Sequence, residues 1–255
     1  MTRYRGILAW LSAGHAVLAG LYWLLLQIPE SNVWMLAASG LVVMAAVWLT
    51  GAIEMTASLA FAADAPVRSA LGTVLGRAWM IVFPLGLFAA IWWATGEAGA
   101  LHARYAGQID AQIIAWTGWT RTAWLHAAIG WLLTFIRWAA GVSLAAALTA
   151  SLAQEGMQGL RPRWIRQALR WKALLATAAA LALGVWLPWQ AAYWRPEALP
   201  PTWVQPAFAA AKLLVMFVLA QLAWAIVLRT AARYLKSCHA TPASSARATQ
   251  APAAS

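Results

Sequence analysis

The sequence predicts an all-α protein, a polytopic transmembrane helix bundle with six spans and both termini in the cytoplasm. Three observations lead to this prediction. First, the 255 residues are 63% hydrophobic and only 10% charged, whereas a soluble domain is about half apolar and about a quarter charged. Second, six apolar stretches are long enough to cross the roughly 30 Å hydrocarbon layer as helices. Third, the basic residues fall on alternate loops, as they do in oriented membrane proteins.

The six apolar stretches cover residues 6–28, 34–62, 78–95, 122–152, 172–190 and 206–229. They are apolar on every face and rich in Leu, Ala and Trp, whereas the strands of a transmembrane barrel alternate apolar and polar residues over about ten positions. No small-x-small cleavage site follows the first stretch, so we interpret it as an uncleaved helix. Residues 1–240 are therefore predicted to form one six-helix transmembrane domain.

The connections between spans differ strongly in charge. Of the 18 Lys and Arg residues, Arg137 and Lys212 lie within spans. Three more, Arg104, Arg121 and Arg195, lie in loops on the side of the membrane opposite the N-terminus. The remaining 13 lie on the same side of the membrane as the N-terminus. The positive-inside rule then places both termini in the cytoplasm and the protein in the cytoplasmic (inner) membrane. Because topology accounts for the net charge of +11, we predict no nucleic-acid partner.

The cytoplasmic connection after the fourth span has the densest positive charge. Its cations are Arg161, Arg163, Arg166, Arg170 and Lys172. Trp164, Leu169 and Trp171 alternate with them, so we expect an interfacial helix with these apolar side chains against acyl chains and the cations at lipid phosphates. The five cations are candidate contacts to anionic head groups on the cytoplasmic side; control of orientation alone is the simpler interpretation.

Two further segments are expected outside the spans. Residues 99–118 carry apolar side chains at four-residue spacing with polar residues between them, which predicts an amphipathic helix lying on the external surface. Residues 241–255 consist mainly of Ala, Ser, Thr and Pro, so they cannot bury enough apolar surface to fold. We expect them to form a disordered cytoplasmic tail.

Arg137 is the most informative residue of the chain. It lies about fifteen residues from either end of the fourth stretch, near the middle of a bilayer at about 1.5 Å per residue. Insertion of an arginine there costs roughly 2.5–3.5 kcal/mol, and such residues usually face a protein interior, a watery cavity or an opposite charge. Thr134 shares its helix face, and Glu54 is the only acid deep in a span, which makes Glu54 a candidate partner. His15, near the middle of the first span, is a candidate to join this polar interior.

No sequence motif indicates catalysis or a cofactor. The chain lacks metalloprotease, serine-hydrolase and phosphate-loop motifs, and its single cysteine, Cys238, rules out a disulfide framework. His15 and His126 are expected at different depths, which argues against a haem site. We therefore predict no catalytic residue, no metal site and no cofactor.

Two functions remain open at this point. The leading one is a non-enzymatic membrane component, meaning an accessory subunit, a scaffold or a lipid-interacting factor, with a membrane-protein partner. The alternative is a small permease or proton-coupled carrier that uses Arg137, Glu54 and His15. Composition and spacing do not decide between them.

Overall fold

The computed structural model describes residues 2–29, 32–194 and 203–239, with side chains up to residue 233. Its regular secondary structure is entirely helical over these ranges. Six helical stretches are long and apolar enough to cross a membrane: Arg3–Gln27, Val33–Ala63, Val67–Thr117, Ala123–Leu160, Trp171–Tyr193 and Val204–Arg233. The predicted all-helical class and the six candidate spans are confirmed. The expected tail at residues 241–255 lies outside the described residues.

The first hairpin consists of α1 (Thr2–Gln27) and α2 (Val33–Ala63). Asn32 caps α2, because its side-chain oxygen accepts hydrogen bonds from the backbone N–H groups of Trp34 (3.1 Å) and Met35 (3.0 Å). Asp64 ends the helix in the left-handed conformation, at φ 52°. Arg3 of α1 donates to the Asp64 carbonyl at 2.6 Å, which joins the two helices at their shared end.

The second hairpin follows two short helices, α3 (Val67–Val74) and η1 (Leu75–Ile81). Its first arm is α4 (Val82–Thr117), and its second arm runs through α5 (Ala123–Phe135), the π-helical turn η2 (Ile136–Ala140) and α6 (Gly141–Glu155). We expected a span that ends at residue 95 and a separate helix over residues 99–118. Instead α4 is continuous, because Gly96 and Gly99 each cost a helix only about 1 kcal/mol and no proline lies between residues 95 and 117.

The third hairpin closes the chain. After η3 (Gly156–Leu160) and α7 (Arg163–Ala168), its first arm runs through α8 (Trp171–Leu181), a second π-helical turn η4 (Ala182–Trp186) and α9 (Leu187–Tyr193). Its second arm is α10 (Val204–His239). Each of the two π-turns thus lies within a candidate span, and such turns occur often at functional sites.

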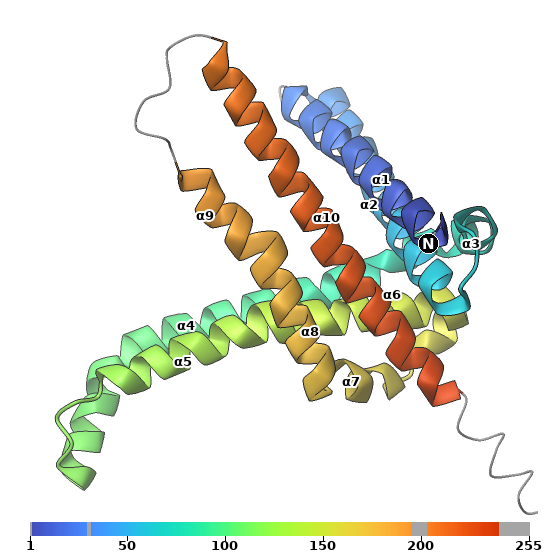
Figure 1. Ribbon diagram of the computed structural model, residues 1–255. Helices are drawn as coiled ribbons and strands as arrows, with labels where there is room; N and C mark the ends of the chain where they lie inside the picture. The colour runs from blue at the N-terminus through green and yellow to red at the C-terminus, as the bar shows by residue number, and fades with distance from the viewer. Residues whose placement is uncertain (1, 30–31, 195–202, 240–255) are drawn as a thin grey trace, which may run out of the picture.

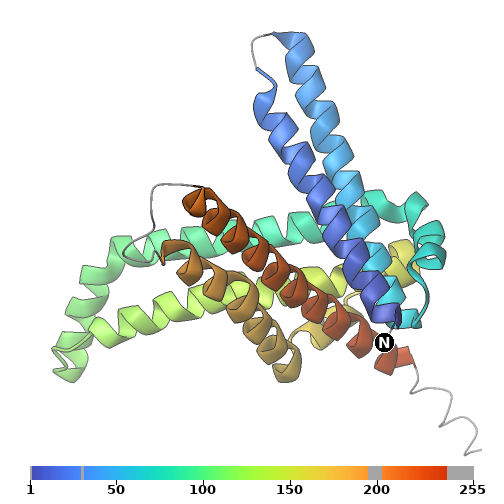
Figure 2. The same cartoon turned by 45° about the horizontal axis from the view of Figure 1, so that its top comes forward.

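The three hairpins meet at one end of the molecule and diverge toward the other (Figure 1). We call the meeting end, where α3, α7 and the N-terminus gather, the basic end, and the opposite one the far end. The hairpin of α4 and α5 extends sideways from the other two, and the last turns of α4 bend away from its long axis in both views (Figure 2).

The buried core lies where α2, α6 and α10 cross. Every residue from position 51 to 58 of α2 is buried, as is most of α6. Many of these residues are Ala, Gly, Ser or Thr, which let helix backbones approach closely in a membrane. Gly51 shows how close: a Cβ atom there would lie 1.8 Å from the carbonyl oxygen of Ala78 in η1.

Candidate functional site

Four polar side chains from three helices meet where the first and third hairpins face each other. His15 of α1 lies with its Nε2 atom 2.9 Å from Oε1 of Glu54 in α2. Trp224 of α10 donates its indole N–H to the other carboxylate oxygen of Glu54 at 2.5 Å. Gln221, one turn earlier in α10, places its side-chain oxygen 2.8 Å from Nδ1 of His15.

The His15–Glu54 contact holds a proton in either state of the pair. Two lone pairs do not face each other at 2.9 Å, so a proton lies between Nε2 and the carboxylate oxygen. It belongs either to the imidazole ring or to the carboxyl group. The proton can therefore pass between the two groups without a large movement of their side chains.

Glu54 is the most deeply buried member of this cluster. Only 4% of its surface is exposed, and an ionised carboxylate so placed needs compensating partners. His15 and Trp224 supply them, one on each oxygen. This carboxylate is thus held in place from two different helices.

A pocket of about 370 Å³ opens beside the cluster. His15, Glu54, Gln221 and Trp224 form its polar side, and the remaining lining residues are aliphatic: Ala180, Leu181, Gly184, Val185, Ala220, Ala223 and Val227. Gly184 belongs to the π-turn η4 and sits so close to α10 that a Cβ atom there would lie 2.4 Å from the Cβ atom of Ala223. The pocket is therefore mostly apolar, with one carboxyl–imidazole pair in its wall.

Arg137 does not join this cluster. Its Nε atom donates to the Thr95 hydroxyl at 2.9 Å, and its guanidinium carbon lies 4.8 Å from the ring centre of Trp92. The candidate Arg137–Glu54 pair is therefore absent from the structure: Arg137 packs against α4, while Glu54 faces α1 and α10. Thr134 also stays apart, because it is exposed and bonds the Gly130 carbonyl of its own helix at 2.8 Å.

Sequence reasoning brought His15 and Glu54 forward but missed Gln221 and Trp224. Their three-residue spacing places both on one face of α10, a signal visible in the sequence. That signal is weak, because tryptophan is common throughout this chain. In addition, the helix that packs against this face of α10 cannot be inferred from local composition.

A second polar cluster lies at the far end of the α4–α5 hairpin. His126 of α5 has Nδ1 3.0 Å from Nε2 of His102 and Nε2 2.7 Å from a carboxylate oxygen of Asp110. Both partners belong to α4, so His126 links two levels of that helix to the start of α5. Within residues 2–29, 32–194 and 203–239, no group of three or more His, Cys, Asp or Glu residues is arranged to hold a metal ion.

Replacing His126 with Ala should loosen this end of the hairpin. Each of its hydrogen bonds contributes roughly 0.5–1.5 kcal/mol, so we expect backbone amide exchange near residues 118–126 to accelerate by about tenfold. Hydrogen exchange followed by mass spectrometry measures this. Gln108→Ala, at an exposed position of the paired helix α4, is the matched control; equal exchange in all three proteins would contradict the prediction.

The basic segment, residues 161–172, follows η3 and comprises α7 and the start of α8. Its five cations, Arg161, Arg163, Arg166, Arg170 and Lys172, are all exposed. The expected placement of Trp164 against acyl chains is wrong, because this side chain is only 7% exposed and packs into the core beside residues of α6. Leu169 and Trp171 are exposed, and contact of the cations with anionic lipid stays a prediction.

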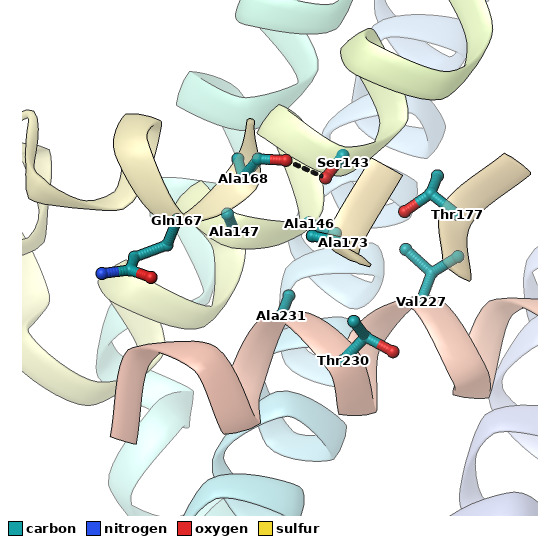
Figure 3. A pocket seen from close by; sticks show the side chains of 10 residues that line it. All are labelled: Ser143, Ala146, Ala147, Gln167, Ala168, Ala173, Thr177, Val227, Thr230 and Ala231. Carbon is teal, nitrogen blue, oxygen red and sulfur yellow. Dashed lines mark hydrogen bonds between the residues drawn. The ribbon is translucent and has the colours of Figure 1, made fainter. Parts of the chain in front are cut away.

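A small cavity lies beneath α7, between α6, α8 and α10 (Figure 3). Its volume is about 10 Å³, close to the minimum that holds one water molecule. Ser143 donates its hydroxyl to the Ala168 carbonyl at 2.8 Å along its wall (Figure 3). This cavity is too small for a substrate. The pocket beside His15 and Glu54 is the candidate site because a carboxyl–imidazole pair lines it.

The helix composition makes this chain a multi-pass membrane protein. Comparison with protein-family models, curated proteins and solved structures finds no match.

Proposed function

We propose that this protein is a small proton-coupled carrier, with His15 and Glu54 as its proton-exchanging pair. One observation carries the proposal: a buried carboxyl–imidazole pair lines a pocket of about 370 Å³ between helices of two different hairpins. Ionisable residues within membrane spans commonly mark ion and substrate pathways. Histidine suits proton exchange because its charge changes near physiological pH.

The pocket lining suggests the class of cargo. Its walls are mainly Ala, Leu, Val and Gly, so they favour an apolar body. Glu54 favours a positive charge or a hydrogen-bond donor, and the Gln221 amide can donate or accept. A small lipophilic amine fits both requirements, and it would compete with the proton for the Glu54 carboxylate.

The hairpin arrangement offers a way to couple binding to movement. Glu54 belongs to the first hairpin, whereas Gln221, Trp224 and Gly184 belong to the third. A proton or a cation at Glu54 changes its contacts with His15 and Trp224, which connect these two hairpins. Rocking of one hairpin against the other would then expose the pocket to alternate sides of the membrane.

Proton movement into vesicles tests the proposal. The purified protein is reconstituted in proteoliposomes that contain a pH-sensitive dye, and a set of lipophilic amines is added outside. We expect a change of internal pH with at least one amine for the natural protein, and its loss in Glu54→Gln, which keeps the side-chain shape but cannot ionise.

Glu97→Gln is the matched control, because Glu97 is an exposed carboxylate on α4, away from the pocket. It should behave as the natural protein does. Equal amine-dependent proton movement in Glu54→Gln and in the natural protein would contradict the carrier proposal. The proposal would also be contradicted if no amine caused proton movement in natural protein that circular dichroism shows to be folded.

One observation favours the accessory-component alternative. The hairpins diverge (Figure 1), and large apolar side chains on them are exposed, among them Trp34 of α2 (80%) and Trp131 of α5 (75%). Either lipid or a partner helix covers such surfaces. Extraction with native lipid followed by mass spectrometry separates the two: a stoichiometric membrane protein would support the component, and its absence would support the carrier.

A further inference from the structure

Arg137 and Lys212 are the two cations that the sequence analysis places inside apolar stretches, and their surroundings in the structure differ. Lys212 of α10 donates to two backbone carbonyls, those of Ala192 at 2.9 Å and Trp194 at 2.8 Å. Its ammonium group is therefore well satisfied by the protein. Arg137 uses only its Nε atom, which donates to the Thr95 hydroxyl.

The outer half of the Arg137 guanidinium remains available. Among the described residues, no carboxylate forms an ion pair with it and no hydrogen bond reaches its two Nη atoms. Gly96 of α4 lies beside them, and a Cβ atom there would be in ordinary van der Waals contact with Nη2, at 3.6 Å. The side chain is partly exposed, so a ligand can reach it from outside the protein.

Aromatic rings fix the orientation of this guanidinium. The Trp92 ring lies under it, 4.8 Å from the guanidinium carbon, and Trp138 packs edge-on against Trp92 at 5.1 Å. A guanidinium that packs on an aromatic ring and makes one hydrogen bond through Nε is held in place, and its two Nη groups point in the same direction. That fork matches the oxygens of a phosphate group, which it can bind through two parallel hydrogen bonds.

The pairing of α4 with α5 also revises the depth of Arg137. Thr95 lies 17 residues beyond Ala78, where the third expected span begins, so the contact is about 26 Å along the helix from that end. The hydrocarbon layer is only about 30 Å thick. Trp92, Trp93 and Trp138 lie within three residues of Thr95 or Arg137 along the chain, and tryptophan gathers where hydrocarbon meets head groups. If the third span begins at Ala78, this count places Arg137 near the head groups of the far leaflet.

We propose that Arg137, positioned by Thr95 and Trp92, is a binding site for a phosphate oxyanion. The two Nη groups bind its oxygens, and the partly exposed side chain lets it approach from outside the protein. A phospholipid head group of the far leaflet and free inorganic phosphate present the same chemistry. This site is separate from the His15–Glu54 pocket and does not depend on the carrier proposal.

The test has a lipid arm and a phosphate arm. In the first, protein in nanodiscs made with or without phosphatidylglycerol is transferred to detergent, and retained phospholipid is counted by native mass spectrometry. In the second, sodium phosphate is titrated into lipid-depleted protein while tryptophan fluorescence is followed, because Trp92 touches the guanidinium. Arg137→Gln should weaken binding about tenfold to a hundredfold, since a charge-assisted pair of hydrogen bonds is lost.

Two further variants keep the test decisive if Arg137→Gln folds poorly. Arg137→Lys retains the charge but loses the fork, so it should bind more weakly than the natural protein while it keeps the same helical circular dichroism. Lys212→Gln is the matched control and should leave binding unchanged, because its ammonium is already occupied by carbonyls.

The outcomes separate the sources of the ligand. Arg137-dependent binding of lipid alone identifies a head-group site, and binding in both arms identifies a site for the phosphate group itself. Equal binding by the natural protein and both Arg137 variants overturns the proposal. A membrane protein that co-purifies only when Arg137 is present also overturns it, because a partner's carboxylate would then be the counter-charge.

Discussion

Replacing Glu54 with Ala should destabilise the protein by about 3–5 kcal/mol, because removal of one partner from a buried polar cluster leaves the others unsatisfied. His15 and Trp224 would both lose their acceptor, at a place where α1, α2 and α10 meet. We expect a large drop in the midpoint of thermal unfolding, measured in nanodiscs by intrinsic fluorescence. Glu97→Ala, at an exposed position, should leave the midpoint nearly unchanged.

Double-mutant cycles show which residue Glu54 depends on. Combined with His15→Ala, Glu54→Ala should be less destabilising than the sum of the single variants, with a coupling of about 0.5–3 kcal/mol. Combined with Arg137→Gln, the effects should add within roughly 0.5 kcal/mol, because the two residues share no partner. Strong coupling to Arg137 and none to His15 would show that the site is assembled differently.

Gly51→Ala should disrupt the packing of the second hairpin against the first. A Cβ atom at this position would lie 1.8 Å from the Ala78 carbonyl oxygen and 2.7 Å from its carbon, both of them backbone atoms. Side-chain rotation cannot relieve this overlap, so η1 must move away from α2. We expect destabilisation of about 3 kcal/mol or more, at the upper end of overpacking effects, seen as a lower unfolding midpoint and a broader size-exclusion profile.

Gly40→Ala provides a control in the same helix with an effect of opposite sign. Gly40 is exposed, and a Cβ atom there would meet nothing within 4 Å. Alanine favours a helix over glycine by about 1 kcal/mol, so this variant should be as stable as the natural protein or slightly more stable. If both substitutions had the same small effect, the close crossing of α2 and η1 would be disproved.

The elements themselves could be predicted because their signal is local. Apolar stretches of sufficient length fold as helices in a bilayer, where each backbone group must find its partner within the segment. The six candidate spans follow from this. The continuation of α4 beyond residue 95 could not be predicted, because hydropathy falls after Thr95 while the helix continues to Thr117.

The candidate site depended on information that no single segment contains. His15 and Glu54 were recognisable as unusual polar residues within spans, yet Glu54, as the only acid deep in a span, was the candidate partner of Arg137. The structure joins Glu54 to His15 and Trp224 instead. Which face of α2 meets α1 depends on packing between helices, and small errors in rotation or depth exchange one partner for another.

By itself, then, the sequence determined the class of the protein, its helices and the scarcity of its buried charges, since composition and length govern transfer into lipid. Only the tertiary structure decided which of those charges meet. Small residues such as Gly51 and Gly184 set how closely the helices cross. That packing closes the His15–Glu54 contact, and the pairing of α4 with α5 leaves Arg137 open to a ligand.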